Sequence, residues 1–160
     1  MVILQMSLHI LNRNELASLA LKIINKVKEA DKKTGGKVSE KFRTRARELF
    51  SLCNYLGTHQ VTAFTYAKAA EKNISGIESV ERTLKYLEGQ ENAIDGIKEE
   101  ALSYSLYGAA ILHYLKKTGI SINTSSLEEI LKTTEEYEFL ILPFMSWLKL
   151  MAEAELTQER

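Results

Sequence analysis

Three histidines and one cysteine are the side chains of this sequence best suited to acid–base catalysis, metal binding or nucleophilic attack. His9, His59 and His113 fall on different predicted elements, whereas metal sites usually combine ligands at short spacings such as i and i+4. Cys53 falls on the apolar face of a predicted helix, where a thiol is typically buried and inert. We therefore predict neither nucleophilic catalysis nor a metal site.

The sequence also lacks the motifs of two other classes of active site. Residues 34–37 contain a Gly-Gly pair and a lysine, but neither the preceding strand nor the spacing of a phosphate-binding loop. Helical ribonucleases of the HEPN type carry an arginine four to six residues before a histidine, and no arginine here has that position. The sequence therefore predicts a protein that is not an enzyme and that uses no cofactor.

The strongest chemical signal is a concentration of cations in the first third of the chain. The net charge is zero, but residues 22–47 contain ten basic and three acidic residues, and residues 72–160 contain nine basic and fifteen acidic ones. Lysine and arginine neutralise phosphates and release counterions. The basic end therefore predicts contact with a polyanion, and the opposite charges of the two ends favour contact with a partner or a second copy.

The spacing of these cations predicts how they are presented. Lys37, Lys41 and Arg45 are four residues apart, so we expect them on one face of a helix, with Arg43 and Arg47 alongside. Such a strip could bind the backbone of a nucleic acid. The alternative is a hydrated surface on which the same cations form weak ion pairs, each worth less than about 1 kcal/mol.

Apolar residues that recur at spacings of three and four predict an all-α fold, a compact bundle of six or seven helices. We expect one helical domain over residues 1–160, with an N-terminal tail at 1–13 and a basic, glycine-containing loop at 31–38. Gly57 should break one helix, and Pro143 should either kink the last helix or start it. The helices are expected at about residues 14–30, 39–56, 58–71, 75–88, 96–118, 125–134 and 135–158.

The sequence predicts a soluble, cytoplasmic protein with no membrane partner. Residues 1–11 are apolar, but they are too few to cross a bilayer that requires about 20. They also lack the basic lead-in and the cleavage site of a secretory signal. The single cysteine forbids an internal disulfide, which fits a reducing compartment.

Three segments carry a resemblance to a known family. Residues 57–68 open a helix after a glycine and place apolar and polar side chains at spacings of three and four. Residues 102–116 are rich in alanine and tyrosine, and residues 147–156 begin with a tryptophan followed by a cation and small residues. In this order, over roughly residues 46–157, they resemble the small α-helical subunit of type III-B (Cmr) CRISPR RNA-guided effector complexes.

The resemblance implies a protein that assembles with RNA in antiviral defence and does no chemistry. The implied partners are the backbone subunits, the large polymerase-like subunit, copies of the protein itself, crRNA and target RNA. Gln60 matches the glutamine of the family's Gly-x-x-Gln segment, Lys68 its closing lysine, and Lys149 a basic position of its last helix. Together with the basic segment, the residues expected to bind RNA are Lys33, Lys37, Lys41, Arg43, Arg45, Arg47, Gln60, Lys68 and Lys149.

Two alternatives remain open at this point. The segment before Gly57 lacks the proline that family members often place there, and residues 1–40 carry no match. These departures leave room for the small subunit of the Csm type. They also leave room for a helical protein-interaction module that makes no direct contact with RNA.

Overall fold

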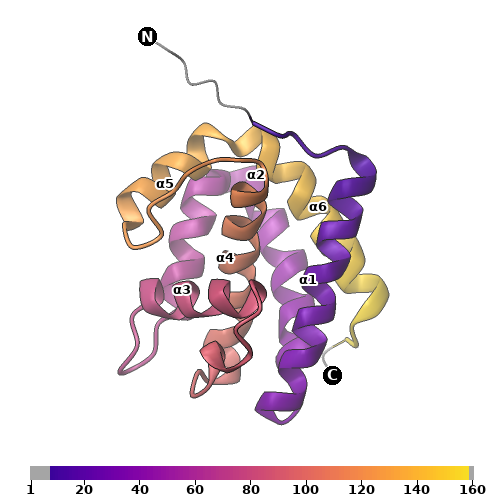
Figure 1. Ribbon diagram of the computed structural model, residues 1–160, viewed down its shortest axis with the longest axis vertical. Helices are drawn as coiled ribbons and strands as arrows, with labels where there is room; N and C mark the ends of the chain where they lie inside the picture. Colours follow the sequence, from indigo (N-terminus) through magenta and orange to yellow (C-terminus); the bar gives the residue numbers. More distant parts are fainter. Residues whose placement is uncertain (1–7, 159–160) are drawn as a thin grey trace.

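The computed structural model describes residues 8–158, and nearly all of them belong to helices or to the short turns that join helices (Figure 1). The prediction of an all-α bundle is confirmed, since the only β-type pairing between residues 8 and 158 is an isolated bridge. The elements are α1 (Arg13–Thr34), α2 (Val38–Ala69), α3 (Gly76–Leu87), the 3₁₀ turn η1 (Glu91–Ile94), α4 (Glu99–Lys117), α5 (Leu127–Glu136) and α6 (Glu138–Glu155).

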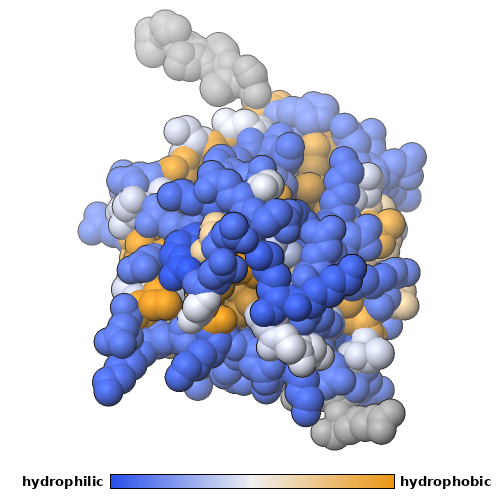
Figure 2. All heavy atoms as spheres, turned by 60° about the horizontal axis from the view of Figure 1, so that its bottom comes forward, coloured by the Kyte–Doolittle hydropathy of each residue, from blue (hydrophilic) through white to orange (hydrophobic). Residues whose placement is uncertain are grey.

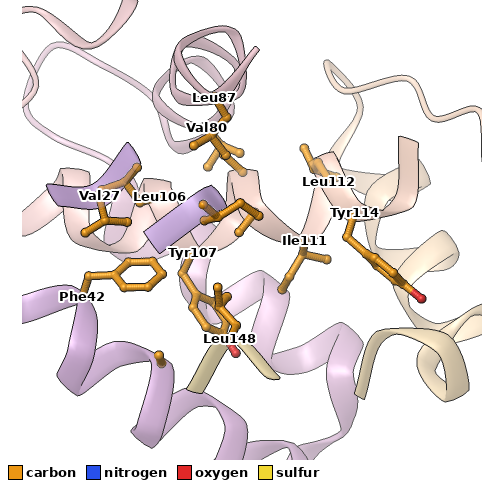
Figure 3. Packing of buried hydrophobic residues seen from close by; sticks show 14 of the residues in the cluster. Val27, Phe42, Val80, Leu87, Leu106, Tyr107, Ile111, Leu112, Tyr114 and Leu148 are labelled. Atoms are coloured by element: carbon orange, nitrogen blue, oxygen red, sulfur yellow. The ribbon is translucent and has the colours of Figure 1, made fainter. Parts of the chain in front are cut away.

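Helix α4 is the centre of the core. Every residue from 101 to 112 is buried, because the helix is apolar or small on all sides and other helices surround it. The Tyr107 ring lies 6.1 Å from that of Phe42 in α2, and the Tyr114 ring stacks on that of Phe144 in α6 at 4.6 Å. Phe42, Tyr107, Tyr114 and their aliphatic neighbours form the part of the packed interior seen in Figure 3. Tyr114 also donates a hydrogen bond of 2.9 Å to the Leu140 carbonyl.

Gly57 divides α2 into two halves, as its position in the sequence predicts. Its backbone angles (φ 80, ψ 156) are not helical, and they belong to a region that only glycine enters easily. From this point the two halves diverge, one passing behind α1 and the other toward α3 and α5 (Figure 1). The backbone N–H of Thr58, at the start of the second half, donates a 2.5 Å hydrogen bond to Oε2 of Glu138. A side chain of α6 therefore caps the second half of α2.

Loss of this cap should destabilise the fold. We expect Glu138→Ala to lower the free energy of unfolding by about 1 kcal/mol at pH 7, the usual value of an N-cap. The hydrogen bond from the Thr58 N–H holds the pKa of Glu138 below its ordinary value. Its contribution is therefore present above the unfolded pKa of about 4.3 and is lost as pH falls through the lower, folded pKa. Urea unfolding of wild type and variant at pH 7 and pH 3 measures both effects.

Glu136→Ala is the matched control, because Glu136 is an exposed glutamate only two residues away whose carboxylate forms no ion pair with another described residue. It should change the free energy of unfolding by less than about 0.5 kcal/mol. Equal losses in the two variants, or a difference that persists at pH 3, would contradict the capping role of Glu138.

Tertiary contacts move several helix ends away from their predicted positions. Helix α1 continues to Thr34, so the expected loop at 31–38 shrinks to residues 35–37. The reason is Asp31, whose carboxylate accepts hydrogen bonds from both the backbone N–H and the hydroxyl of Ser39 and thereby joins α1 to the start of α2. Gly35, in the left-handed region (φ 85), ends α1.

The region before α4 is also less helical than expected. Gly96 has a positive φ of 85, so α4 begins at Glu99 instead of residue 96, and η1 occupies part of the gap. Arg82 of α3 holds this turn by donating hydrogen bonds to the carbonyls of Ala93 and Asp95. A long-range contact of this kind leaves no local signal in the sequence.

Pro143 neither starts the last helix nor interrupts it. Helix α6 begins at Glu138, after Tyr137 separates it from α5, and Pro143 is inside the helix. The expected single helix over residues 135–158 is therefore wrong at its start. The cap of α5 is Ser126, whose hydroxyl accepts from Glu129 N–H, so this helix begins at Leu127 and not at about residue 125.

The N-terminal tail was expected at residues 1–13, of which 1–7 lie outside the described residues. His9 N–H donates a 2.9 Å hydrogen bond to the Thr118 carbonyl at the end of α4, and α1 begins at Arg13. Among the described helices, none combines the length and the apolar character that a transmembrane span requires.

Candidate nucleic-acid interface

The basic and acidic parts of the chain neutralise each other within the molecule to a large extent. Five cations of the basic segment bind carboxylates that follow much later in the sequence or lie on another helix. The end of the molecule with the α1–α2 turn and η1 is accordingly hydrophilic, as Figure 2 shows. The pairs are Lys26–Glu91 (2.7 Å), Lys28–Glu155 (2.5 Å), Lys33–Asp95 (3.4 Å), Lys41–Glu100 (3.2 Å) and Arg45–Glu100 (2.7 Å).

The cations of α2 lie on two flanks of the helix. Residues two positions apart on an α-helix point about 200° apart. Lys41 and Arg45 thus share one side of the buried stripe, toward α4, while Arg43 and Arg47 share the other side. The single strip expected from the sequence does not form.

One flank forms a row of charged and aromatic side chains, which we call the α2–α4 row: Lys41, Glu100, Arg45, Tyr104, Phe64 and Lys68. Glu100 binds both Lys41 and Arg45. Although burial acts to raise the pKa of Glu100, the hydrogen bond from Lys41 and the charge of Arg45 lower it below its ordinary value. The carboxylate therefore stays ionised and compensates part of the positive charge on this flank.

Aromatic contacts continue the row along α4 and the second half of α2. The Arg45 guanidinium lies 4.4 Å from the centre of the Tyr104 ring, and its side chain is only 13% exposed. The Tyr104 and Phe64 rings pack edge to face with their centres 6.1 Å apart, and the Lys68 ammonium lies 5.7 Å from the centre of the Phe64 ring. Gln60 is exposed one turn before Phe64. The row therefore brings together Lys41, Arg45 and Lys68, which sequence analysis selected from two different segments, and Gln60 precedes it on the second half of α2.

The other flank forms the α2–α6 patch, which consists of Arg43, Arg47, Phe50 and Lys149. The three α2 residues follow one another at helical spacings of four and three, and the Lys149 ammonium of α6 lies 5.8 Å from the Phe50 ring. Within residues 8–158, no carboxylate forms an ion pair with Arg43, Arg47 or Lys149. Nε of Arg43 is buried without a hydrogen-bond partner. These three cations can therefore bind an anionic ligand without first leaving a carboxylate of the described residues.

The two remaining candidates lie near the α1–α2 turn. Lys33 donates a 3.0 Å hydrogen bond to Oδ1 of Asn92 and binds Asp95, so it holds η1 against α1. Lys37 is the exposed residue that precedes α2 and makes no side-chain cap. The nine selected residues thus fall into three groups on different parts of the surface.

The cysteine and two of the histidines considered for catalysis are buried or lie beside a single carboxylate. Cys53 is buried beside Met145 (Sγ–Sδ 3.9 Å), and burial raises the pKa of its thiol to about 11, so it is protonated at neutral pH. His9 lies 3.1 Å from Glu15, and His59 lies 3.8 Å from Glu135. Between residues 8 and 158, no three His, Cys, Asp or Glu side chains lie together in a way that could hold a metal ion.

Comparison with known proteins gives one informative result. No protein-family model matches the sequence, and no curated protein matches it. The structure is similar to a chain in the cryo-EM structure of the type III-B Cmr-beta complex bound to non-cognate target RNA, with a TM-score of 0.71 and 22% sequence identity. The similarity covers 93% of this chain and 99% of that chain, so the two share one fold from end to end.

Proposed function

We propose that this protein is the small, non-catalytic subunit of a type III-B (Cmr) CRISPR effector complex in the cytoplasm. In this role it stacks along the backbone of the complex and holds guide or target RNA during antiviral defence. The observation that carries the proposal is the shared fold, since the structural match extends over 93% of this chain and 99% of a chain from an RNA-bound Cmr-beta complex. The resemblance of residues 57–68, 102–116 and 147–156 supports the same family independently.

We assign the RNA contact to the α2–α6 patch. RNA binding without sequence readout depends on cations that can meet phosphates, and a cation already bound to a carboxylate must first give up that partner. Arg43, Arg47 and Lys149 have no such partner among the described residues, whereas Lys41 and Arg45 share Glu100. Sequence specificity would come from base pairing with the guide, as in other RNA-guided systems.

Coexpression with the other subunits of a Cmr complex tests the assembly. We expect a tagged copy of this chain to purify with the backbone subunits, the large polymerase-like subunit and crRNA in one particle of fixed composition. Recovery of the remaining subunits as a complete particle without this chain would contradict the proposal. Parallel coexpression with Csm-type subunits distinguishes the two kinds of type III complex.

The second candidate is a protein-interaction module without RNA contact. It is favoured by the pairing of Lys41 and Arg45 with Glu100, which leaves less charge on the α2–α4 row for a polyanion. This candidate predicts assembly into the same particle with no protein–RNA crosslink to the chain. Crosslinking of the purified particle, followed by mass spectrometry of the crosslinked peptides, separates the two.

A further inference from the structure

A cleft lies between α1 and the C-terminal end of α4, beside the end of α3. Its volume is about 700 Å³, within the range of about 300–1,000 Å³ typical of small-molecule sites. Leu19, Ile23 and Leu87 form its apolar floor and are 8%, 2% and 9% exposed, respectively. The polar lining is rich in cations: Lys22, Lys26, Lys116 and Lys117, together with His113.

Two of the four lysines form ion pairs with described carboxylates, and the other two do not. Lys26 binds Glu91 and Glu29, and Lys116 binds Glu88 at 2.5 Å. Lys22 and Lys117 are exposed and form no ion pair with any described carboxylate. Both also line an adjoining hollow of about 530 Å³ that leads toward the start of α1. The uncompensated charge is therefore concentrated where the two hollows meet.

His113 adds a titratable group to the same cleft. It is half-buried, and burial, followed by the charge of Lys117, lowers the pKa of its imidazole. The other charged groups around the cleft are Lys116 and Glu88 beside it, and Lys22, Lys26 and Glu29 of α1 across it. A bound anion would oppose the effect of the lysines and favour the protonated ring.

We propose that this cleft binds a nucleoside phosphate, with the phosphate between Lys22 and Lys117 and the nucleoside over the apolar floor. Free ammonium groups beside an apolar surface match a ligand that joins an anion to a flat, weakly polar ring. The ligand is either a free nucleotide or the terminal nucleotide of an RNA. The site uses none of the residues assigned to the α2–α6 patch, so it does not depend on the proposed function.

Calorimetric titration of the full-length chain with ADP, without divalent cations, tests the site. We expect saturable binding that weakens at least tenfold in Lys22→Ala plus Lys117→Ala, because each lysine contributes a charge-assisted contact. The matched control is Lys72→Ala plus Lys132→Ala, which removes two exposed lysines outside the cleft and should change the affinity less than twofold. NMR titration of His113 should show a higher pKa with ADP bound.

Three further ligands test the separate contributions of the nucleoside and the phosphate. Adenosine and tripolyphosphate should each bind more weakly than ADP, because each lacks half of the proposed contacts. Absence of ADP binding at millimolar concentration, equal loss in the control variant, or tripolyphosphate binding as tightly as ADP would overturn the assignment. A 5′-phosphorylated oligonucleotide, compared with its 5′-hydroxyl form, tells whether the phosphate comes from an RNA end or from a free nucleotide.

Discussion

Arg43→Ala plus Arg47→Ala is expected to weaken the binding of single-stranded RNA by about ten- to thirtyfold at low salt. Both arginines lie in the α2–α6 patch without a carboxylate partner among the described residues. Loss of two phosphate contacts at about 1 kcal/mol each gives this factor, since about 1.4 kcal/mol is tenfold. The slope of log affinity against log salt should also become shallower by about 1.4. Fluorescence anisotropy of a labelled RNA at several salt concentrations measures both quantities.

The matched control is Lys41→Ala plus Arg45→Ala, which removes the same charge from the same helix. We expect less than about a threefold change in RNA affinity, because Glu100 already compensates these two cations. Urea unfolding of both variants checks that the fold survives the loss of the contact between Arg45 and Tyr104. Equal weakening in the two variants would remove the α2–α6 patch as the preferred RNA surface.

Local signals were sufficient for most of the fold. The break at Gly57 requires a conformation that the sequence marks with glycine, and the helix expected at about residues 75–88 begins after the cap Ser75, which accepts a hydrogen bond from Glu78 N–H. Two of the errors occur where a long-range contact decides where a helix begins or ends. Asp31 lengthens α1 through Ser39, and Arg82 holds a non-helical turn before α4. Neither contact follows from periodicity or capping rules.

The candidate site was less predictable than the fold, and the reasons differ from group to group. Helical geometry alone separates Arg43 and Arg47 from Lys41 and Arg45, so the two flanks could have been predicted from the spacing. The role of Glu100 could not, because it lies 55 residues after Arg45 and reads as one more surface glutamate. Tyr104 was noted only as part of an alanine- and tyrosine-rich segment, yet it joins Arg45 to Phe64.

Two glycines, one in α3 and one in α4, lie at close contacts between α3, α4 and the second half of α2. Their substitution should affect the free energy of unfolding very differently. Gly76, the first residue of α3, lies against the backbone of α2. A Cβ at this position would overlap the carbonyl oxygen of Tyr66 and lie 2.9 Å from its carbonyl carbon. Tyr66 is buried in a helix and cannot move independently. We expect Gly76→Ala to lower the free energy of unfolding by about 3 kcal/mol.

Gly108→Ala is the comparison that isolates the backbone contact. Its Cβ would meet only side-chain methyl groups, at 3.3 Å from Val80 Cγ2 and 3.5 Å from Thr65 Cγ2. Replacing a glycine inside a helix gains up to about 1 kcal/mol in helix propensity, which offsets the tight contact, so the net change should stay within about 1 kcal/mol. Urea unfolding of the two variants gives the difference directly. Helix α3 ends at Leu87, which lines the cleft, so a shift of α3 in Gly76→Ala should also weaken ADP binding. Similar stability and similar ADP affinity in the two variants would show that the contact at Gly76 does not hold α3 in place.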